Sequence, residues 1–322
     1  ENSIVAETGM NTITVSSDAS AYAVHTWTSS TDSANPVNLT IEGKTGNIIT
    51  TTDAVSSSTC AGSAIVSGYH NSTTDFGYGG AIAVITDTGD NVIKGIGLQG
   101  YGVAALNSID ADSGVTIEAK TGNNTIVGSA DAVGAANGIV TIQSDEGSNY
   151  LEGAKSAYLN YDGEGHAVHV SNPENTRNST DRGVGYSLVE VTAATSNTFI
   201  GNYDMAIVAN GTNATANISA GTTNTVTVNA ARSASTDSTV SDDYVLADYV
   251  TETAETAAVF AVNGGTVNLN GQQGNTISGG DLAIWVLTQI QDAVLEDTAE
   301  AVLFTAESGI IRFLVPCQGF FL

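Results

Sequence analysis

An asparagine followed by a short apolar strand recurs along the chain, and this repeat constrains the fold more than any other feature. Each asparagine begins a run containing Ile, Val, Leu or Phe, and a glycine often ends the run, as Gly95 and Gly128 do. The repeated asparagines are Asn11, Asn47, Asn91, Asn124, Asn149, Asn197, Asn224 and Asn275. Such self-similarity indicates a repeat architecture in which each unit packs against its neighbours.

The spacings between these asparagines predict the number of units. Successive spacings are 36, 44, 33, 25, 48, 27 and 51 residues, and the values 25 and 27 suggest the length of one unit. The values 44, 48 and 51 fit either two units or one unit with a long loop. Taken as units of about 24 residues, the repeat predicts roughly 11–13 coils. At about 4.8 Å per coil, such a stack is roughly 55–65 Å long.

Each unit contains the patterns of three short strands. An alternating strand precedes the asparagine, as in residues 114–119, and a third apolar strand recurs at residues 81–85, 205–209 and 257–262. Period-two patterns rich in β-branched residues and bounded by Gly and Asn are typical of strands. Three short strands cannot bury their apolar faces alone, so we expect parallel stacking into a β-solenoid. Equivalent asparagines then lie above one another and can form an amide ladder.

The repeat is similar to that of a known class of secreted proteins. Its fullest form, Gly-Val-x-Ile-x-Ala-x-Thr-Gly-Asn-Asn-x-Ile-x-Gly, runs from Gly114 to Gly128. It resembles the right-handed parallel β-helix passengers of autotransporter and related type V secreted bacterial adhesins, over most of residues 1–315. The resemblance implies an all-β, right-handed parallel β-helix that is exported to, or released from, a bacterial surface. The pattern is a style of repeat and carries no catalytic signature.

The charge composition excludes two classes of partner. The chain has 8 Lys and Arg against 34 Asp and Glu, a formal net charge of −26. Binding to nucleic acid requires basic side chains that displace counterions, and an anionic membrane repels an acidic chain. A run of 18 apolar residues, as a membrane-spanning helix requires, is missing from the sequence. With 41% hydrophobic residues the chain can bury a core, and we expect one solenoid domain over residues 1–322.

Motifs for metals and cofactors are weak. The two cysteines, Cys60 and Cys317, are far apart in the sequence and form no CxxC motif. Neither belongs to a group of cysteines and histidines that would suggest a zinc site. His166 and His169 are three residues apart, which on one strand sends the side chains to opposite faces and argues against joint metal ligation. We therefore expect neither a metal nor a cofactor.

Carbohydrate-active enzymes also use parallel β-helices, so catalysis is the third interpretation. Paired carboxylates with a nearby basic residue are the requirement, and the best candidates are Asp162, Glu164 and Arg182. Polar surface loops explain the same residues, and the sequence contains neither a nucleophile elbow nor a P-loop. We therefore predict a non-enzymatic protein with no catalytic residues.

Two segments depart from the repeat and are expected to be loop insertions, near residues 171–185 and 231–256. The second contains Asp242, Asp243, Tyr244 and Tyr249. Tyrosine supplies rigid contact area together with a hydroxyl, which suits recognition of a glycan or protein of a host or neighbouring cell. The other interpretation is a solvated acidic loop.

The C-terminal segment is unusually apolar. It contains Phe313, Phe320, Phe321 and Leu322. A solenoid exposes unpaired backbone groups at its terminal coils, and docking onto another copy there produces an open filament. The first expectation is an extracellular or cell-surface, non-enzymatic adhesin or stalk. The alternative is a structural subunit that self-assembles end-to-end into an extracellular filament.

Overall fold

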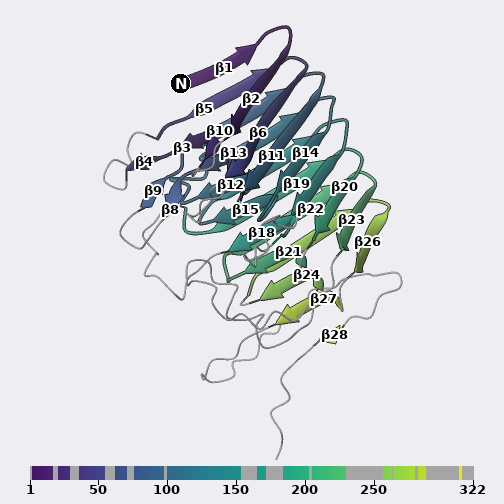
Figure 1. Ribbon diagram of the computed structural model, residues 1–322. Helices are drawn as coiled ribbons and strands as arrows, with labels where there is room; N and C mark the ends of the chain where they lie inside the picture. Colours follow the sequence, from purple (N-terminus) through teal and green to yellow (C-terminus); the bar gives the residue numbers. More distant parts are fainter. Residues whose placement is uncertain are drawn as a thin grey trace, which may run out of the picture.

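The computed structural model describes residues 2–16, 21–29, 36–54, 62–70, 76–97, 100–153, 165–171, 184–202, 205–229, 257–262, 264–279, 282–287 and 312–313. In these residues the regular structure consists entirely of β-strands. Most of the strands belong to three parallel sheets, which we name A, B and C. The chain passes through A, B and C in turn, so each passage forms one coil (Figure 1).

Sheets A and B contain the strands on either side of the repeated asparagines. Sheet A consists, in spatial order, of β1 (Asn2–Ala6), β5 (Leu39–Gly43), β10 (Ala81–Thr86), β13 (Gly114–Ala119), β16 (Ile139–Ser144), β19 (Ser187–Ala193), β22 (Ala214–Ala220) and β25 (Thr266–Gly271). Sheet B consists of β2 (Met10–Ser16), β6 (Gly46–Ala54), β11 (Asp90–Gly97), β14 (Asn124–Gly128), β17 (Asn149–Gly153), β20 (Asn197–Gly201), β23 (Thr223–Val228) and β26 (Gly274–Gly279). Neighbours in both sheets follow the order of the sequence, which is the arrangement of a parallel β-solenoid.

Sheet C contains the third strand of each coil. It consists of β3 (Tyr22–Thr26), β7 (Ser63–Ser67), β12 (Val103–Leu106), β15 (Val133–Ala136), β18 (Val168–Ser171), β21 (Met205–Asn210), β24 (Ala257–Val262), β27 (Leu282–Leu287) and β28 (Arg312–Phe313). A small antiparallel sheet lies beside it, made of β4 (Thr28–Ser29), β8 (Tyr69–His70) and β9 (Phe76–Tyr78).

One repeated asparagine corresponds to one coil, whatever the spacing. Asn47 pairs directly with Asn91, although 44 residues separate them. The 48-residue and 51-residue spacings likewise connect adjacent strands. The prediction of 11–13 coils is therefore too high for the described residues, in which sheets A and B have eight strands each, because the long spacings contain one coil with a long connection. Eight such strands span about 34 Å along the stack.

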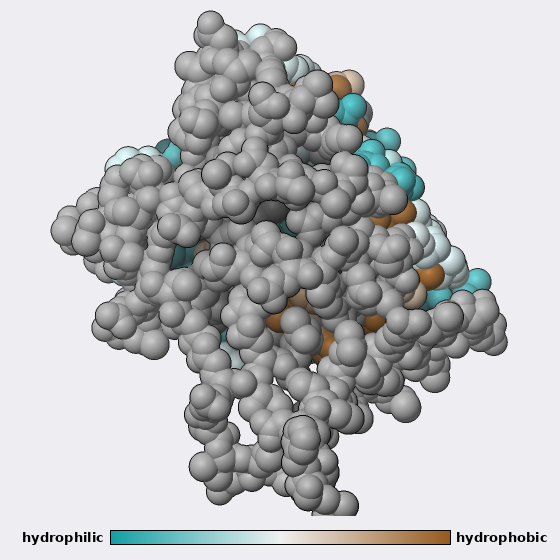
Figure 2. Space-filling view, turned by 60° about the horizontal axis from the view of Figure 1, so that its bottom comes forward, coloured by the Kyte–Doolittle hydropathy of each residue, from teal (hydrophilic) through white to brown (hydrophobic). Residues whose placement is uncertain are grey.

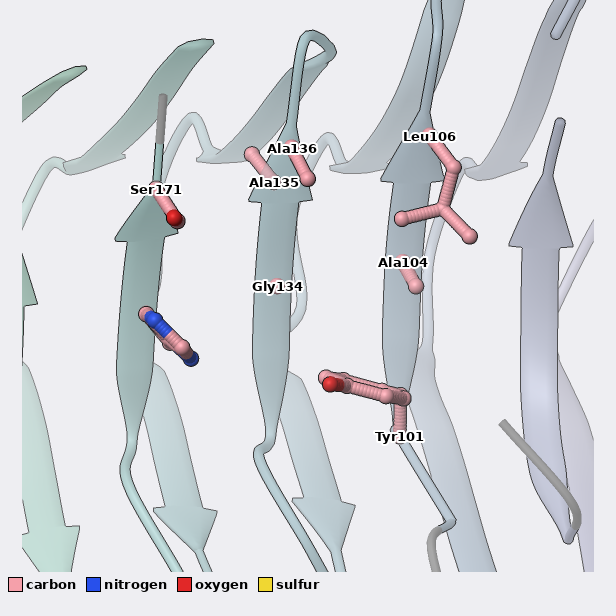
Figure 3. A pocket seen from close by; sticks show the side chains of 8 residues that line it. Tyr101, Ala104, Leu106, Gly134, Ala135, Ala136 and Ser171 are labelled. Carbon is pink, nitrogen blue, oxygen red and sulfur yellow. The ribbon is translucent and has the colours of Figure 1, made fainter. Parts of the chain in front are cut away.

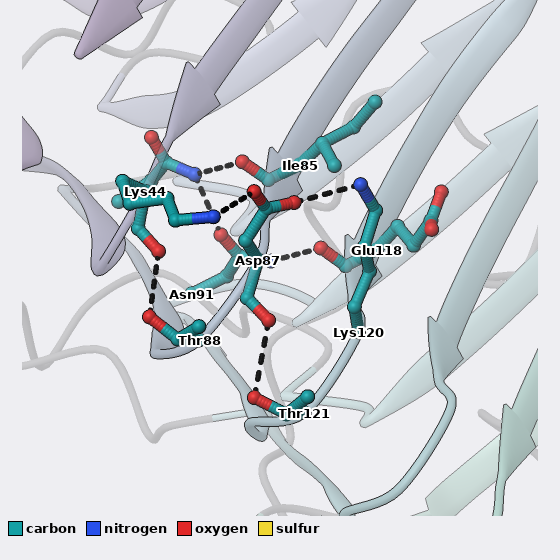
Figure 4. A network of polar contacts seen from close by, with 9 residues as sticks. Lys44, Ile85, Asp87, Thr88, Asn91, Glu118, Lys120 and Thr121 are labelled. Atoms are coloured by element: carbon teal, nitrogen blue, oxygen red, sulfur yellow. Dashed lines mark hydrogen bonds and ion pairs between the residues drawn. The ribbon is translucent and has the colours of Figure 1, made fainter. Parts of the chain in front are cut away.

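The predicted amide ladder is present. Each asparagine side chain donates from Nδ2 to Oδ1 of the next, over distances of 2.8–2.9 Å, from Asn11 to Asn275. In six of them the second Nδ2 hydrogen reaches a backbone carbonyl near the end of a neighbouring sheet A strand, as Asn91 does with Glu118 at 2.8 Å (Figure 4). Asn47, Asn91, Asn124, Asn197 and Asn224 are fully buried. The ladder therefore satisfies buried amides at the corner between sheets A and B.

Three columns of apolar side chains form the core, because each coil places the same position above the last. The sheet B column contains Ile13, Ile49, Ile93, Ile126, Leu151, Phe199, Val226 and Ile277. The sheet A column contains Ile41, Val84, Ile117, Ile142, Val191, Ile218 and Leu269. The sheet C column contains Val24, Ile65, Val103, Val133, Val168, Ile207, Val259 and Ile284.

Sheet C differs from the others because its central strands are buried on both faces. Strands of A and B alternate between buried and partly exposed residues, whereas every residue of β21 and β24 is buried. The outward side chains of these two strands form a separate apolar cluster that includes Met205, Val208 and Phe260. Continuous apolar runs are typical of parallel strands that are covered on both sides.

The described surface mixes polar and apolar residues. Figure 2 shows hydrophobic residues beside hydrophilic ones along one edge of the stack. Among the residues that the structure describes, the exposed large hydrophobic side chains are Ile4, Val5, Met10, Trp27, Val37 and Ile96. Among the described residues there is no helix long and apolar enough to cross a membrane.

Candidate functional site

Most of the residues predicted to act lie outside the described part of the chain. These are the proposed recognition residues Asp242, Asp243, Tyr244 and Tyr249, the end residues Phe320, Phe321 and Leu322, and the catalytic candidates Asp162, Glu164 and Arg182. The predicted loop insertions lie there too, except for residues 171, 184 and 185. Phe313 belongs to β28, where its backbone pairs with Val286.

The structure instead brings together three ionisable side chains from two successive coils. The Asp131 carboxylate contacts both His166 and His169, with 2.9 Å between Oδ1 and His166 Nδ1 and 3.1 Å between Oδ2 and His169 Nδ1. The imidazole rings lie edge to face with 5.3 Å between their centroids. All three residues are buried, and Asp131 is completely so. A buried charge of this kind requires compensation from its neighbours.

Register explains why Asp131 and His166 meet. Val133 pairs with Val168 in adjacent strands of sheet C, and each of the two residues lies two positions before its valine. Asp131 therefore stacks on His166, and its Oδ1 also accepts a hydrogen bond of 3.1 Å from the His166 backbone N–H.

The prediction that His166 and His169 point to opposite faces is wrong. Alternation applies within a strand, but β18 begins at Val168, so His166 lies in the preceding turn next to Gly165. Gly165 has a φ of 61°, in the left-handed region that favours glycine. Because the chain turns here, both rings reach the same carboxylate.

An uncharged residue fills the same structural role in an earlier coil. Ser63 lies two positions before Ile65, and its Oγ accepts a hydrogen bond of 3.0 Å from the Tyr101 backbone N–H. Asp131 does the same for His166 two coils further along the column. A neutral hydroxyl can therefore take the place of the carboxylate at this corner, so the stacking does not need a charge.

Opposing effects act on the Asp131 carboxyl group. Burial alone raises its pKa, because a low-dielectric environment disfavours the charged form. The charge of His166 and hydrogen bonds from both imidazoles outweigh that effect and hold the pKa well below its ordinary value of 3.8. Asp131 is therefore a carboxylate at neutral pH.

A small hollow borders His169 on the outer face of sheet C. Tyr101, Leu106, Gly134 and Ala136 also line it, and the Tyr101 ring, just before β12, reaches across toward Gly134 (Figure 3). A Cβ atom on Gly134 would lie 2.7 Å from that ring, so glycine leaves room for the tyrosine. The cavity volume is about 10 Å³, close to the minimum for one water molecule. It is too small to hold a sugar ring.

Gly128 allows the chain to approach itself just before Asp131. A Cβ atom at this position would lie 1.8 Å from the Asp131 carbonyl oxygen and 2.7 Å from the Gly102 amide nitrogen. Replacing Gly128 by Ala is therefore expected to destabilise the protein by about 1–3 kcal/mol, as overpacking does. Urea denaturation measures this change. Gly9→Ala is the matched control, because no atom lies within 4 Å of its added Cβ, and equal effects of the two substitutions would contradict the prediction.

A second group of charges lies on the surface, at the turns between sheets A and B. Asp87 lies between two lysines from neighbouring coils, with Oδ2 2.8 Å from Lys44 Nζ and Oδ1 2.7 Å from Lys120 Nζ (Figure 4). The hydrogen bond from Lys120 and that from Lys44 lower the pKa of Asp87 to about 2. The same contact with Asp87 raises the pKa of Lys120.

The Asp87 group predicts a pH and salt dependence. Because the pKa is lowered in the folded state, the stabilising contribution of Asp87 is present above its ordinary pKa of 3.8 and is lost as the pH falls towards 2. An NMR titration is expected to find the pKa of the Asp87 carboxyl near 2, and Lys120→Ala or high salt is expected to move it towards 3.8. An Asp87 pKa that is indifferent to both changes would contradict this geometry.

Sequence reasoning missed Asp131. It lies 35 residues before His166, and no motif spacing links the two. The signal that finds it is register: once the inward valines of sheet C are aligned, residues two positions before them form a column.

Comparisons with known proteins identify no relative. Neither a family model, nor a curated protein, nor a solved structure matches this chain. The function of the chain is therefore inferred from its own residues and their geometry.

Proposed function

We propose that the chain is a non-enzymatic rod of an exported bacterial surface protein, acting as an adhesin or a stalk. The observation that carries the proposal is the unbroken amide ladder from Asn11 to Asn275, which fixes successive coils in register. The three apolar core columns support it, because they fill the interior along the whole described stack. A solenoid built in this way presents side loops and a long surface at fixed positions.

The winding of the proposed rod is right-handed. Each coil connects a strand to its parallel neighbour in the same sheet by way of two other strands. Crossover connections between parallel strands of one sheet are overwhelmingly right-handed, because strands themselves twist in that sense. This handedness also agrees with the resemblance to autotransporter passengers.

Recognition is assigned to the segment at residues 231–256, and binding experiments test it. The purified chain should bind a glycan array or host cells, and Tyr244→Ala with Tyr249→Ala should reduce that binding. Tyr150→Ala is the control, since Tyr150 lies on β17 with its hydroxyl 2.7 Å from Glu152. Depolymerisation of a polysaccharide by the purified chain, lost in Arg182→Ala, would replace this proposal with an enzymatic one.

End-to-end assembly is the second candidate, and the exposure of β1 favours it. Among the described strands β1 pairs with β5 alone and β2 with β6 alone. Ile4 and Val5 of β1 are 42% and 52% exposed, and Met10 at the start of β2 is 53% exposed. An edge of unpaired backbone groups with apolar side chains is a template for another strand. Negative-stain microscopy separates the candidates, because the first predicts isolated short rods. Regular fibres that disappear in Val5→Lys would establish the second.

A further inference from the structure

The group of Asp131, His166 and His169 offers three metal-ligand atoms in a protected place. One carboxylate oxygen and one nitrogen from each imidazole lie within 4.8 Å of one another. The exposed fractions of the three residues are 0%, 1% and 5%, so bulk water does not compete for these atoms. Sheet C fixes the backbone of His169 in β18, and the stacking of Asp131 on His166 fixes the other two.

The distances suit a small divalent ion. In a tetrahedral zinc site with bonds of 2.0–2.1 Å, ligand atoms lie about 3.3 Å apart. Asp131 Oδ1 is 2.9 Å from His166 Nδ1 and Oδ2 is 3.1 Å from His169 Nδ1, and all three donor atoms lie within 4.8 Å of one another. Side-chain rotations that shorten the longest of these separations bring the donors to the spacing of a zinc site. Imidazole nitrogen with carboxylate oxygen is a donor set that zinc and its neighbours in the first transition row accept.

The fold alone does not require this set of side chains. The role of Asp131 in stacking is filled by the neutral Ser63 hydroxyl two coils earlier. Register places Met205 after His166 in the same column, so an apolar residue also fits. Two imidazoles and a carboxylate are therefore an addition to what the corner needs, and buried ionisable groups are usually paired or bound to metal.

The charge balance favours a cation. In the metal-bound form both imidazoles are neutral, so the Asp131 carboxylate leaves the group with one negative charge, inside a chain whose formal net charge is −26. A divalent ion neutralises the carboxylate, and each Nδ1 proton moves to Nε2 when a neutral imidazole coordinates through Nδ1. A site with three protein ligands usually takes a water molecule as its fourth ligand.

From this geometry we propose that Asp131, His166 and His169 form a binding site for a divalent first-row transition-metal ion, with Zn²⁺ as its best fit. The site joins two successive coils of the solenoid, so the bound ion ties them together. It also stabilises the folded state, because the ligands are assembled only there. This inference is independent of the proposed adhesin or stalk function.

The test titrates Zn²⁺ into the full chain after treatment with EDTA, in excess Mg²⁺ to saturate exposed carboxylates. Calorimetry is expected to show one Zn²⁺ per chain, accompanied by a rise in Tm. His166→Gln and His169→Gln are each expected to weaken binding at least 100-fold, since loss of even an outer-shell partner costs about 10–100-fold. His25→Gln is the matched control. His25 lies on sheet C in the same outward-facing row as His169, and its Nε2 is 3.0 Å from the Gly68 carbonyl oxygen.

A measurement on the unaltered chain keeps the proposal falsifiable if the variants fold poorly. Histidine ring resonances in ¹H–¹⁵N NMR spectra are expected to shift for His166 and His169 on addition of Zn²⁺, and to stay in place for His25. The absence of saturable binding in Mg²⁺ would overturn the proposal and leave a buried ion pair held by protons. Binding that persists unchanged in both folded variants would overturn it as well.

Discussion

Replacing Asn124 by Leu is expected to lower the free energy of unfolding by about 3–5 kcal/mol, although the two side chains have the same number and branching of heavy atoms. The Asn124 amide donates 2.8 Å hydrogen bonds to the Gln143 carbonyl and to Asn149 Oδ1, and it accepts one of 2.9 Å from Asn91. Leucine neither donates nor accepts hydrogen bonds, so these three partner groups stay buried and lose their bond to residue 124. Each unsatisfied group costs about 1–3 kcal/mol.

Urea denaturation followed by circular dichroism measures the effect, and Asn268→Leu is its control. Asn268 also donates a 2.8 Å interstrand bond to an asparagine, Asn217, but the pair is exposed to water. The control is therefore expected to change stability by no more than about 0.5 kcal/mol. Similar losses in the two variants would mean that the buried ladder does not stabilise the stack as the structure indicates.

Removing the Asp131 carboxylate is the second change with a large expected effect. Asp131→Ala leaves two imidazoles and the His166 backbone N–H in a buried site without their shared acceptor. Breaking a buried ion pair by deleting one partner typically costs about 3–5 kcal/mol. We expect a loss of this size at neutral pH, measured in EDTA so that a bound metal does not contribute.

The pH dependence of this loss has a defined sign. The pKa of Asp131 is lowered in the folded state, so its stabilising contribution is present above the ordinary value of 3.8 and decreases as the pH falls below it. The stability difference between the wild type and Asp131→Ala should therefore narrow in acid. Asp90→Ala is the control: Asp90 also accepts a backbone hydrogen bond, 2.8 Å from the Asn123 amide, but it is exposed. A loss equal to that of Asp131→Ala would contradict the role of burial.

The sequence predicts the ladder well because its physical cause is local. An inward asparagine is needed wherever the chain turns from sheet A into sheet B, and all eight asparagines identified from the repeat form the ladder. The all-β fold and the three strands per coil follow from the same pattern of alternating residues and turns. These features depend on neighbours in sequence, so inspection of the chain is enough to find them.

The number of coils and the buried charged site depend on distant residues, and the sequence predicts neither. A spacing of 44 residues can contain one coil or two, and only the pairing of Asn47 with Asn91 distinguishes them. His166 and His169 look like opposite faces of a strand, and their common partner Asp131 becomes visible only when adjacent coils are aligned.

The central claim is that each repeated asparagine closes one coil, and disulfide cross-linking tests it most directly. In a background with Cys60 and Cys317 replaced by Ser, the pair Thr50→Cys and Lys94→Cys joins positions that face each other in β6 and β11. Adjacent strands lie about 4.8 Å apart, within the Cα separation that a disulfide spans, whereas strands two coils apart lie about 9.6 Å apart.

Mild oxidation is therefore expected to cross-link Thr50→Cys to Lys94→Cys nearly completely, as peptide mapping by mass spectrometry would show. Thr50→Cys with Val127→Cys, which lie two strands apart, should remain reduced. Failure of the first pair, or cross-linking of the second in its place, would contradict the arrangement of one asparagine per coil.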